Sequence, residues 1–444
     1  MRALFGLSVV IAVASCGPDT RPGDHFVDSG PADACTNLQC RTVNCAAMNM
    51  PPTTISGTVY APNGTLALFG INVYVPNEVP GAIEQGLTCG HCTSSLPGSP
   101  IEAVLSDEAG HFTLSNMPSG GDIPLVITSG KWRRQVLIPQ INPCTDNPLP
   151  AELTRLPKDH TEGEMPSVAV AAGGADSMEC MIKRLGIADS EITTDHESGK
   201  VHLYAGEGGV ASFRSGYAGG HGAITNAMTL WNSLDKLKNY DIVLLSCEGS
   251  PYPTDKPQAA MDNLKMYADL GGRVFASHYH GIWVKGAADA GGTQAPAVWP
   301  TIANWEPTEQ SGPVTDVIDE VNNPKGMAFA TWMLAVGGSV TRDLITLTGG
   351  SGRATVISVN AGKGEQWVTA GGTNKTQVFQ FETPNEVPEE QRCGKVVYSD
   401  MHVSGDTSSG AFPDNCGGTT TLSAQEKAIA FMFFDLATCV GPIQ

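Results

Sequence analysis

Positive charge is scarce in this sequence. Its 444 residues include 26 Lys and Arg against 45 Asp and Glu, a formal net charge of −19. Such a chain repels phosphate backbones and anionic lipid head groups, so nucleic acid is not an expected partner. Charged residues are only 16% of the chain, whereas there are 51 Gly and 30 Pro. This balance favours many turns and short strands over long helices.

The apolar run at the N-terminus is short. Residues 3–14 are apolar, Arg2 is the one positive charge before them, and Ser15 and Cys16 follow. A run of this length cannot span a bilayer as a helix, which needs about 20 apolar residues. The pattern predicts a secretory signal peptide over residues 1–15 and a mature chain that leaves the cytoplasm.

The residues at the expected cleavage site, Val13-Ala14-Ser15-Cys16, resemble the lipobox of bacterial lipoproteins. The resemblance implies that cleavage falls before Cys16 and that a lipid on Cys16 anchors the chain in a membrane. The next residue is Gly17 rather than Asp, which in such lipoproteins implies the outer membrane or the cell surface. The alternative is an ordinary signal peptide with a Cys nearby.

Twelve cysteines fit an oxidising compartment, in which disulfides persist. Eleven of the twelve remain when Cys16 is set apart, and an odd number requires a free thiol or an intermolecular bond. Sequence alone does not fix the pairing. The disulfide candidates are Cys35, Cys40, Cys45, Cys89, Cys92, Cys144, Cys180, Cys393, Cys416 and Cys439.

Spacing adds expectations for the N-terminal cysteines. Cys35, Cys40 and Cys45 are evenly spaced and include no Cys-x2-Cys pair, which favours local disulfides over a metal site. The segment Cys89-Gly90-His91-Cys92 lies between short strands rather than at the start of a helix. It is therefore expected to form a structural disulfide or a loose metal loop, not a redox centre.

The C-terminal cysteines carry two further expectations. One disulfide among Cys393, Cys416 and Cys439 is expected to hold the end of the chain. Cys247 is expected to be buried or disulfide-bonded, and Cys180 is a candidate partner for it.

Composition divides the chain into segments. Residues 16–52 are rich in Pro, Gly, Asp and Ser and are expected to be a Cys-containing tether. Residues 53–145 alternate apolar and polar side chains in short strands, with a tight turn at Asn63-Gly64. A Pro-rich linker over 146–165 precedes residues 166–444, in which strands and helices alternate.

Two motifs in the first of these domains carry a family resemblance. Residues 55–59 (Ile-Ser-Gly-Thr-Val) and 107–112 (Asp-Glu-Ala-Gly-His-Phe) resemble the opening strand and the hairpin of the carboxypeptidase-regulatory-like family. The resemblance implies a transthyretin-like β-sandwich. Domains of that family have no catalytic activity and act as spacers or binding modules.

Continuous apolar strands separated by helices in residues 166–444 predict an α/β, flavodoxin-like domain. Its sheet is expected to be mostly parallel and covered on both faces, so the whole chain is a multidomain protein. Residues 283–317 lack periodicity and are expected to be an irregular insertion. Expected strands include 168–174, 200–204, 240–246 and 273–277, and expected helices are 176–185, 225–237, 258–270 and an amphipathic helix at 423–436.

Ligands bind at the carboxyl ends of strands in an open α/β sheet. Reactive or polar residues follow four of the expected strands. They are the turn 173–176 and then Cys247, Glu248, His278, His280, Asp400 and His402.

Residues 271–278 and 394–402 resemble segments of trehalose-utilisation-like proteins, which are relatives of class I glutamine amidotransferases. Amidotransferases use a nucleophilic Cys at a strand-to-helix turn, with a His and a Glu to activate it. Here the turn is near Ser277-His278 and has no Cys, and no Glu neighbours His402. Cys247 follows a different strand. The resemblance therefore implies the fold without a glutaminase triad.

Three interpretations of the sheet-edge histidines stay open. His278 and His402 are expected foremost as hydrogen-bonded core residues. They could instead form a small-ligand or catalytic pocket, or His278, His280 and His402, with Asp400 and Glu248, could hold a metal ion. No cofactor is expected.

The order of these segments resembles surface lipoproteins of myxobacteria-like bacteria. The resulting hypothesis is a lipid-anchored envelope protein that binds a partner, such as a carbohydrate or an envelope protein, without catalysis. The alternative is a surface hydrolase or carbohydrate-modifying enzyme that uses His278, His402 and Asp400.

Overall fold

The computed structural model describes residues 35–91, 95–296, 299–312, 314–348, 352–403, 410–418, 420–438 and 440. The expected signal peptide, the lipidation site Cys16, Cys92 and Cys439 lie outside this part of the chain. The residues from Asn37 onward form one compact unit. Within the described ranges, no helix has both the length and the apolar composition needed to cross a membrane.

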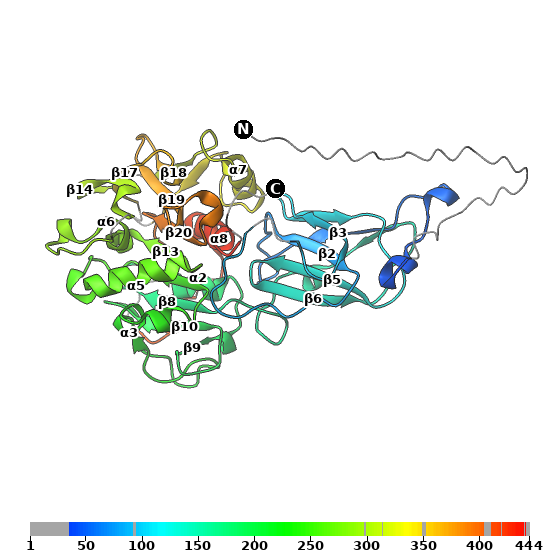
Figure 1. Cartoon of the computed structure of the whole chain (residues 1–444), viewed down its shortest axis with the longest axis horizontal. Helices are drawn as coiled ribbons and strands as arrows, with labels where there is room; N and C mark the ends of the chain where they lie inside the picture. The colour runs from blue at the N-terminus through cyan, green and yellow to red at the C-terminus, as the bar shows by residue number, and fades with distance from the viewer. Residues whose placement is uncertain are drawn as a thin grey trace, which may run out of the picture. The chain divides into compact units, whose positions relative to one another are not determined.

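The strands between residues 54 and 148 form two small sheets (Figure 1). One has the order β4-β1-β7 and the other the order β3-β2-β5-β6. Apolar residues of both sheets, including Ile55, Phe112 and Ile127, belong to a single core. The strands are β1 Thr54–Thr58, β2 Asn72–Pro76, β3 Pro100–Leu105, β4 His111–Leu114, β5 Ile123–Ser129, β6 Trp132–Ile138 and β7 Asp146–Pro148.

The predicted turn after β1 is present. The side-chain oxygen of Asn63 accepts hydrogen bonds from the backbone N–H groups of Thr65 and Leu66, each at 3.0 Å. Gly64 has φ +72°, a left-handed conformation that glycine adopts without strain.

The rest of the chain forms a mixed sheet of 13 strands. Its main path is β11-β10-β8-β12-β13-β20-β19-β18-β15-β16, and β9, β14 and β17 pair beside this path. The strands are β8 Val168–Ala172, β9 Ile192–Thr193, β10 Val201–Ala205, β11 Thr225–Asn226, β12 Ile242–Leu245, β13 Arg273–Ser277, β14 Ala303–Ser311, β15 Thr315–Ile318, β16 Leu344–Thr346, β17 Arg353–Val359, β18 Glu365–Ala370, β19 Thr376–Thr383 and β20 Gly394–Ser399.

The prediction that the sheet is mostly parallel is wrong for about half of its strands. The pairs from β11 to β20 along the path are parallel. From β20 onward the neighbours are antiparallel. Residues 371–375 connect β18 to β19. A connection this short can only reverse the chain, so the two strands must be antiparallel.

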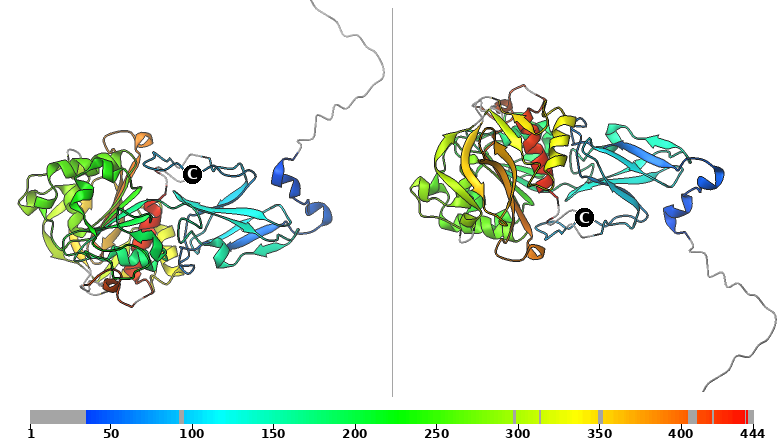
Figure 2. Two further views of the ribbon diagram at one scale, coloured as in Figure 1. Left: turned by 90° about the horizontal axis from the view of Figure 1, so that it is seen from below. Right: turned by 90° about the horizontal axis from the view of Figure 1, so that it is seen from above.

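Helices cover both faces of the large sheet (Figure 2). Alternate residues of β8 point to opposite faces, since Val170 belongs to one core cluster and Ala171 to the other. The helices packed against the face of Val170 are α2 Met178–Arg184, α7 Gly326–Ala335 and α8 Ala424–Leu436. The opposite face is covered by α3 Met228–Trp231, α4 Leu234–Leu237, α5 Gln258–Asp269 and α6 Ile282–Lys285.

Three local expectations differ from the structure. The expected helix 225–237 is divided into β11, α3 and α4, because Ser233 is extended and its side chain caps α4. The expected insertion 283–317 contains β14, which is ordered by pairing with the distant β17. Helix α8 has the predicted capping box of Ser423 and Glu426, but it is buried on most sides rather than amphipathic. Figure 1 shows it, in red, beside β20.

Disulfides join segments that are distant in sequence. The described residues contain Cys45–Cys144, Cys89–Cys393 and Cys180–Cys416, with sequence separations of 99, 304 and 236. Cys35 and Cys40 are also disulfide-bonded.

These pairs correct three expectations. Cys45 does not form a local disulfide. Cys393 and Cys416 each bond to a cysteine far from the C-terminus, and Cys180 bonds to Cys416 rather than Cys247. Tertiary packing, not spacing along the chain, brings the paired sulfur atoms together. Cys247 is the free thiol among the described residues, and it is buried.

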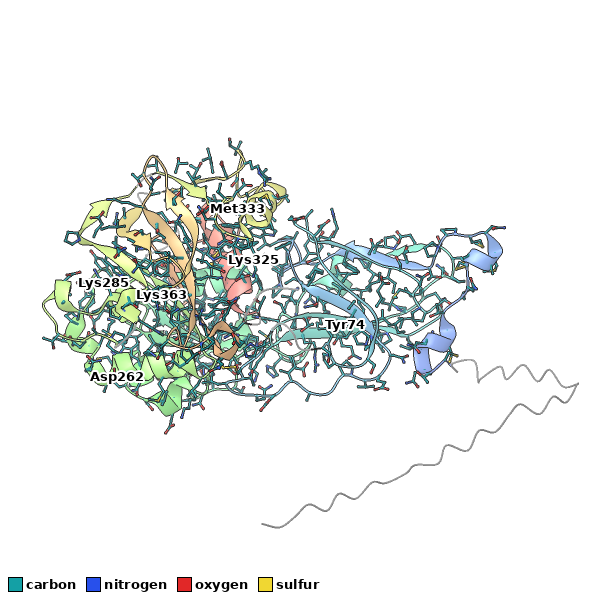
Figure 3. The ribbon with its side chains drawn as sticks, turned by 45° about the horizontal axis from the view of Figure 1, so that its top comes forward. Tyr74, Asp262, Lys285, Lys325, Met333 and Lys363 are labelled. Atoms are coloured by element: carbon teal, nitrogen blue, oxygen red, sulfur yellow. A yellow bond between two sulfur atoms is a disulfide. The ribbon has the colours of Figure 1, made fainter. Side chains whose placement is uncertain are left out.

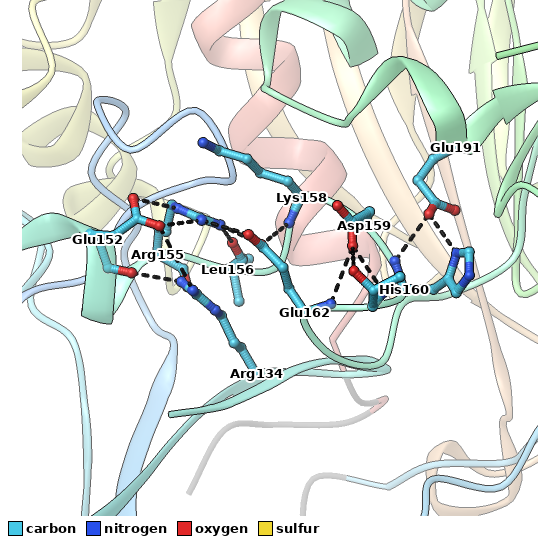
Figure 4. Close-up of polar contacts among 10 residues, drawn as sticks. Arg134, Glu152, Arg155, Leu156, Lys158, Asp159, His160, Glu162 and Glu191 are labelled. Carbon is cyan, nitrogen blue, oxygen red and sulfur yellow. Dashed lines mark hydrogen bonds and ion pairs between the residues drawn. The ribbon is translucent and has the colours of Figure 1, made fainter. Parts of the chain in front are cut away.

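The segment 146–165 contains internal ion pairs and is joined to its surroundings by hydrogen bonds and packing. Arg155 is 2% exposed and forms ion pairs of 2.6 Å with both Glu152 and Glu162 (Figure 4). Arg134 of β6 donates to the backbone oxygen of Glu152 at 2.7 Å. Helix α1 Ala151–Thr154 lies in this segment and contacts β1. Further along, Trp332 of α7 donates to the backbone oxygen of Ala67 at 2.8 Å.

Candidate functional site

Three reactive side chains meet at the carboxyl edge of the parallel strands. Cys247 lies just after β12, His278 directly follows β13, and His402 lies just after β20. These strands are neighbours in the sheet, in the order β12-β13-β20, and parallel neighbours end at the same edge. The register places Ser277 opposite Ser399, so the residues after them come close together.

The three side chains form a compact, buried group. The distance from Cys247 Sγ to His278 Nδ1 is 3.4 Å. The ring centroids of His278 and His402 are 5.1 Å apart. One potential metal-binding atom of each residue lies within 4.8 Å of those of the other two. The exposed fractions are 0% for Cys247, 2% for His278 and 7% for His402. We call these residues the Cys/His cluster.

The backbone at His278 has an unusual conformation. Its φ is +38°, a left-handed value that non-glycine residues adopt rarely and with strain. The short 3-10 helix His278–Gly281 follows, so His278 lies at a sharp strand-to-helix turn. The hydroxyl of Tyr398 on β20 lies 3.0 Å from the His278 carbonyl oxygen and 2.7 Å from Asp400, and shares its one proton between these two acceptors. This contact supports the turn. An enzyme of the amidotransferase type would have its nucleophile at such a turn.

Burial favours the uncharged form of all three groups. It raises the pKa of the Cys247 thiol to about 12, although hydrogen bonds from the backbone of Tyr279 and Gly249 oppose the rise. Burial, together with the charges of His402 and Arg353, lowers the pKa of His278 to about 2. The pKa of His402 is lowered to about 4 by burial and by Arg353. At neutral pH the group is therefore a thiol with two neutral imidazoles.

Asp176 supports the residues next to both histidines. It lies in the turn after β8 and is 1% exposed. It accepts a hydrogen bond from the Ser277 hydroxyl and another, at 2.7 Å, from the backbone N–H of Val403. Burial raises its pKa to about 7, against the lowering effect of these bonds. The sequence places Asp176 in a post-strand turn, but no residue pattern distinguishes it as a support for the histidines.

His280 has other partners and does not join the Cys/His cluster. Its Nε2 donates to the carbonyl oxygen of Ser246 at 2.9 Å, and its Nδ1 accepts from Trp283 Nε1 at 2.8 Å. Both ring nitrogens are therefore used in hydrogen bonds within the protein. This is the arrangement of a structural core histidine.

Glu248 is part of a buried ion pair. Its carboxylate is 2.6 Å from the ammonium group of Lys256, and the two side chains are 3% and 0% exposed. The Lys256 ammonium also lies 5.3 Å from the centre of the Trp231 ring. The carboxylate accepts a further hydrogen bond from the backbone of Glu207 at 3.0 Å.

Asp400, just after β20, belongs to a hydrogen-bonded group with Thr355 of β17 and Tyr398 of β20. It accepts hydrogen bonds from Thr355 N at 2.8 Å and from the Tyr398 hydroxyl at 2.7 Å. Burial and the nearby Asp400 carboxylate raise the pKa of Asp316 to about 8. The structure thus brings together Cys247, His278 and His402. Asp400 is instead hydrogen-bonded to Thr355 and Tyr398.

A second group of potential metal ligands consists of Cys89, His91 and Cys393. Two of its three members form a disulfide, and a disulfide sulfur is a poor metal ligand compared with a thiolate. His91 Nε2 is 3.4 Å from Cys89 Sγ. The disulfide is therefore a structural cross-link between the start of β20 and the loop before β3.

A cavity of about 650 Å³ lies elsewhere, between the four-stranded sheet and the start of the large sheet. Its lining includes the charged residues Lys131, Arg133, Asp241 and Arg273. Lys131 pairs with Asp241 at 2.6 Å, and Arg133 pairs with Glu164 at 2.5 Å. Tyr74, which Figure 3 labels, also lines the cavity and is buried. The volume is within the range of small-molecule sites, about 300–1,000 Å³.

Comparisons with known proteins leave the chain without a family. No protein-family description matches it, and no curated protein matches it. Two solved structures that it matches are interface mutants of a type II cohesin–X-dockerin complex from Acetivibrio cellulolyticus. Each is 12% identical, with a TM-score of 0.16, and each match covers 33% of this chain and 79% of the other. At this level the similarity carries no argument about fold or function.

Proposed function

We propose that this protein is exported, is anchored by a lipid on Cys16 at the outer membrane or cell surface, and binds a ligand without turning it over. The disulfides support export, because such bonds persist in oxidising compartments and are rare in the cytoplasm. In this proposal the lipid on Cys16 is the part of the protein that contacts the membrane.

The burial of the Cys/His cluster is the observation that carries the non-catalytic part of the proposal. The strand-to-helix turn that would hold a nucleophile in an amidotransferase has His278 instead. The nearby thiol, Cys247, is 0% exposed and is favoured in its protonated form. A nucleophilic cysteine needs both access to substrate and thiolate character.

The finer fold assignments are also part of this proposal. Six parallel strands with helices on both faces support a flavodoxin-like domain that is related to amidotransferases and has lost their chemistry. The two small sheets, which share a core, support a transthyretin-like sandwich before it.

The cavity of about 650 Å³ gives the proposal a place for a ligand. Its cations Lys131 and Arg133 are paired with carboxylates, and the guanidinium of Arg273 already donates to the backbone carbonyl oxygens of Gly271, Cys393 and Thr438, which leaves few donors for an ionic ligand. A neutral polyhydroxylated molecule, such as an envelope carbohydrate, fits this chemistry, because its hydroxyl groups can both donate and accept hydrogen bonds.

A hydrolase that uses His278, His402 and Asp400 is the second candidate function. The adjacent imidazoles favour it. The hydrogen bonds of Asp400 with Thr355 and Tyr398 weigh against it, because they leave the carboxylate without an evident role in orienting His402.

Anchoring is tested by expressing the whole chain in a Gram-negative bacterium and fractionating the cells. We expect the protein in the outer-membrane fraction, with a mass equal to a chain from Cys16 plus acyl groups. Cys16→Ala is expected to lose this membrane association, and Cys247→Ser, the matched control, is expected to keep it. A soluble wild-type chain with another N-terminus would contradict the proposal.

Binding is tested on the purified chain without its signal peptide, using neutral oligosaccharides in calorimetry. Ala103 is exposed and lines the cavity, so Ala103→Trp is expected to fill it and abolish binding. Ala47→Trp, at an exposed position that does not line the cavity, is the control. Turnover of neutral esters or glycosides that disappears in His278→Ala would instead establish the hydrolase.

A further inference from the structure

We infer that Cys247, His278 and His402 together bind one transition-metal ion, for which zinc is the best match. The inference concerns the Cys/His cluster alone. It does not depend on the lipid anchor or on the ligand cavity, so it can fail while the proposed function holds.

The spacing of the donor atoms matches a zinc site. Zinc lies about 2.3 Å from a thiolate sulfur and about 2.0–2.1 Å from an imidazole nitrogen, in a tetrahedron. Two such ligands are therefore about 3.6 Å apart. Cys247 Sγ and His278 Nδ1 are separated by 3.4 Å, and the His402 donor completes a group within 4.8 Å. An ion would need only small side-chain movements to reach all three atoms.

A hydrogen bond between the Cys247 thiol and the His278 imidazole explains why these two side chains lie together, but it does not explain the position of His402. His402 is 7% exposed, and its Nε2 is buried without a hydrogen-bond partner among the described residues. A buried polar atom without a partner costs about 1–3 kcal/mol. A metal ion at the cluster gives this imidazole a role that neither Cys247 nor His278 supplies.

The surroundings hold the ligands in place. Asp176 bonds to Ser277 and Val403, which are the direct neighbours of His278 and His402. The Tyr398 hydroxyl bonds to the backbone of His278. Supports of this kind fix the orientation of ligands in metal sites and strengthen the binding.

The donor set indicates which ions bind. A thiolate with two imidazoles suits zinc and copper, whereas magnesium and calcium prefer oxygen ligands. Metal coordination removes the proton of a thiol. Cys247 can therefore bind an ion even though it is protonated when no metal is present. Three protein ligands leave one tetrahedral position for water.

Cobalt(II) and zinc titrations of the purified, oxidised chain test the inference. Disulfides remove the other described cysteines as thiolate ligands, so Cys247 is the described thiolate that can bind. We expect one ion per chain and a sulfur-to-cobalt charge-transfer band. Cys247→Ser is expected to abolish the band, and both Cys247→Ser and His402→Gln should lower zinc affinity by about 100-fold or more. His111→Gln, at an exposed histidine, is the control.

Two outcomes would overturn the inference: no metal bound above the level of Cys247→Ser, or a spectrum without a sulfur ligand. Zinc-edge X-ray absorption of the unmutated chain makes the test independent of the folding of any variant. It should show one sulfur and two imidazole ligands. If copper displaces zinc stoichiometrically with the same ligands, the site stands and the preferred ion changes.

Discussion

The backbone N–H of Val403 donates a 2.7 Å hydrogen bond to Asp176, 227 residues earlier in the chain. The same carboxylate accepts from Ser277, so one buried side chain joins the ends of β13 and β20. Residues adjacent to both of the cluster's histidines are therefore held by an acid in the turn that follows a third strand, β8.

This relationship predicts different outcomes for two substitutions of Asp176. Asn can accept from Val403 and donate to the Ser277 hydroxyl, so Asp176→Asn should keep zinc affinity within a few-fold. Asp176→Ala removes both bonds and should weaken zinc binding by about 10–100-fold. It should also lower the free energy of unfolding by about 1–3 kcal/mol. Zinc titration and urea unfolding check both variants, and equal affinities in the two would contradict this role.

Stability should decrease in acid through Glu162. Hydrogen bonds from Arg155, opposed by burial, lower the pKa of this carboxyl to about 2 in the folded protein, from an ordinary value of 4.5. The ionised form is favoured by folding, so the stabilisation is full above pH 4.5 and is lost as the pH falls towards 2.

Glu162→Gln should therefore reduce the free energy of unfolding by about 1–3 kcal/mol at neutral pH, since the pair is partly exposed to solvent. The difference from wild type should shrink as the pH decreases from 4.5. Urea unfolding at several pH values measures it, with Glu78→Gln, at an exposed position, as the control. A difference that does not change with pH would refute the assignment.

The buried pair of Lys256 and Glu248 should show strong coupling. Glu248→Gln or Lys256→Met alone leaves a buried charge without its partner and should cost about 3–5 kcal/mol. The double variant leaves no charge and should be less destabilised than either single variant. A double-mutant cycle by urea unfolding measures the coupling, and additive effects would show that the pair is unimportant.

The disulfide between Cys180 and Cys416 should contribute substantially to stability. It closes a loop with a sequence separation of 236 between α2 and the short helix Asp414–Cys416. Cys180→Ala with Cys416→Ala should lower the free energy of unfolding by about 2–5 kcal/mol. Thermal unfolding with and without reductant checks this. The variant should lose less stability on reduction than wild type does, and an equal loss would count against the assignment.

The sequence determined the features that depend on near neighbours. The apolar run of β8, the glycine turn at Asn63-Gly64 and the capping box of Ser423 with Glu426 follow from patterns a few residues long. The position of His278 just after a strand was predicted from the apolar residues within β13, and that of His402 from the family resemblance of residues 394–402.

Only the tertiary structure decided which distant residues meet. Cys247, not His280, completes the Cys/His cluster, because the pairing of β12 with β13 sets its place and His280 turns to Ser246 and Trp283. The cysteine pairs and the antiparallel half of the large sheet were hidden for the same reason. Local propensity acts over a few residues, whereas strand register and disulfide choice depend on packing between segments that the sequence separates by up to hundreds of positions.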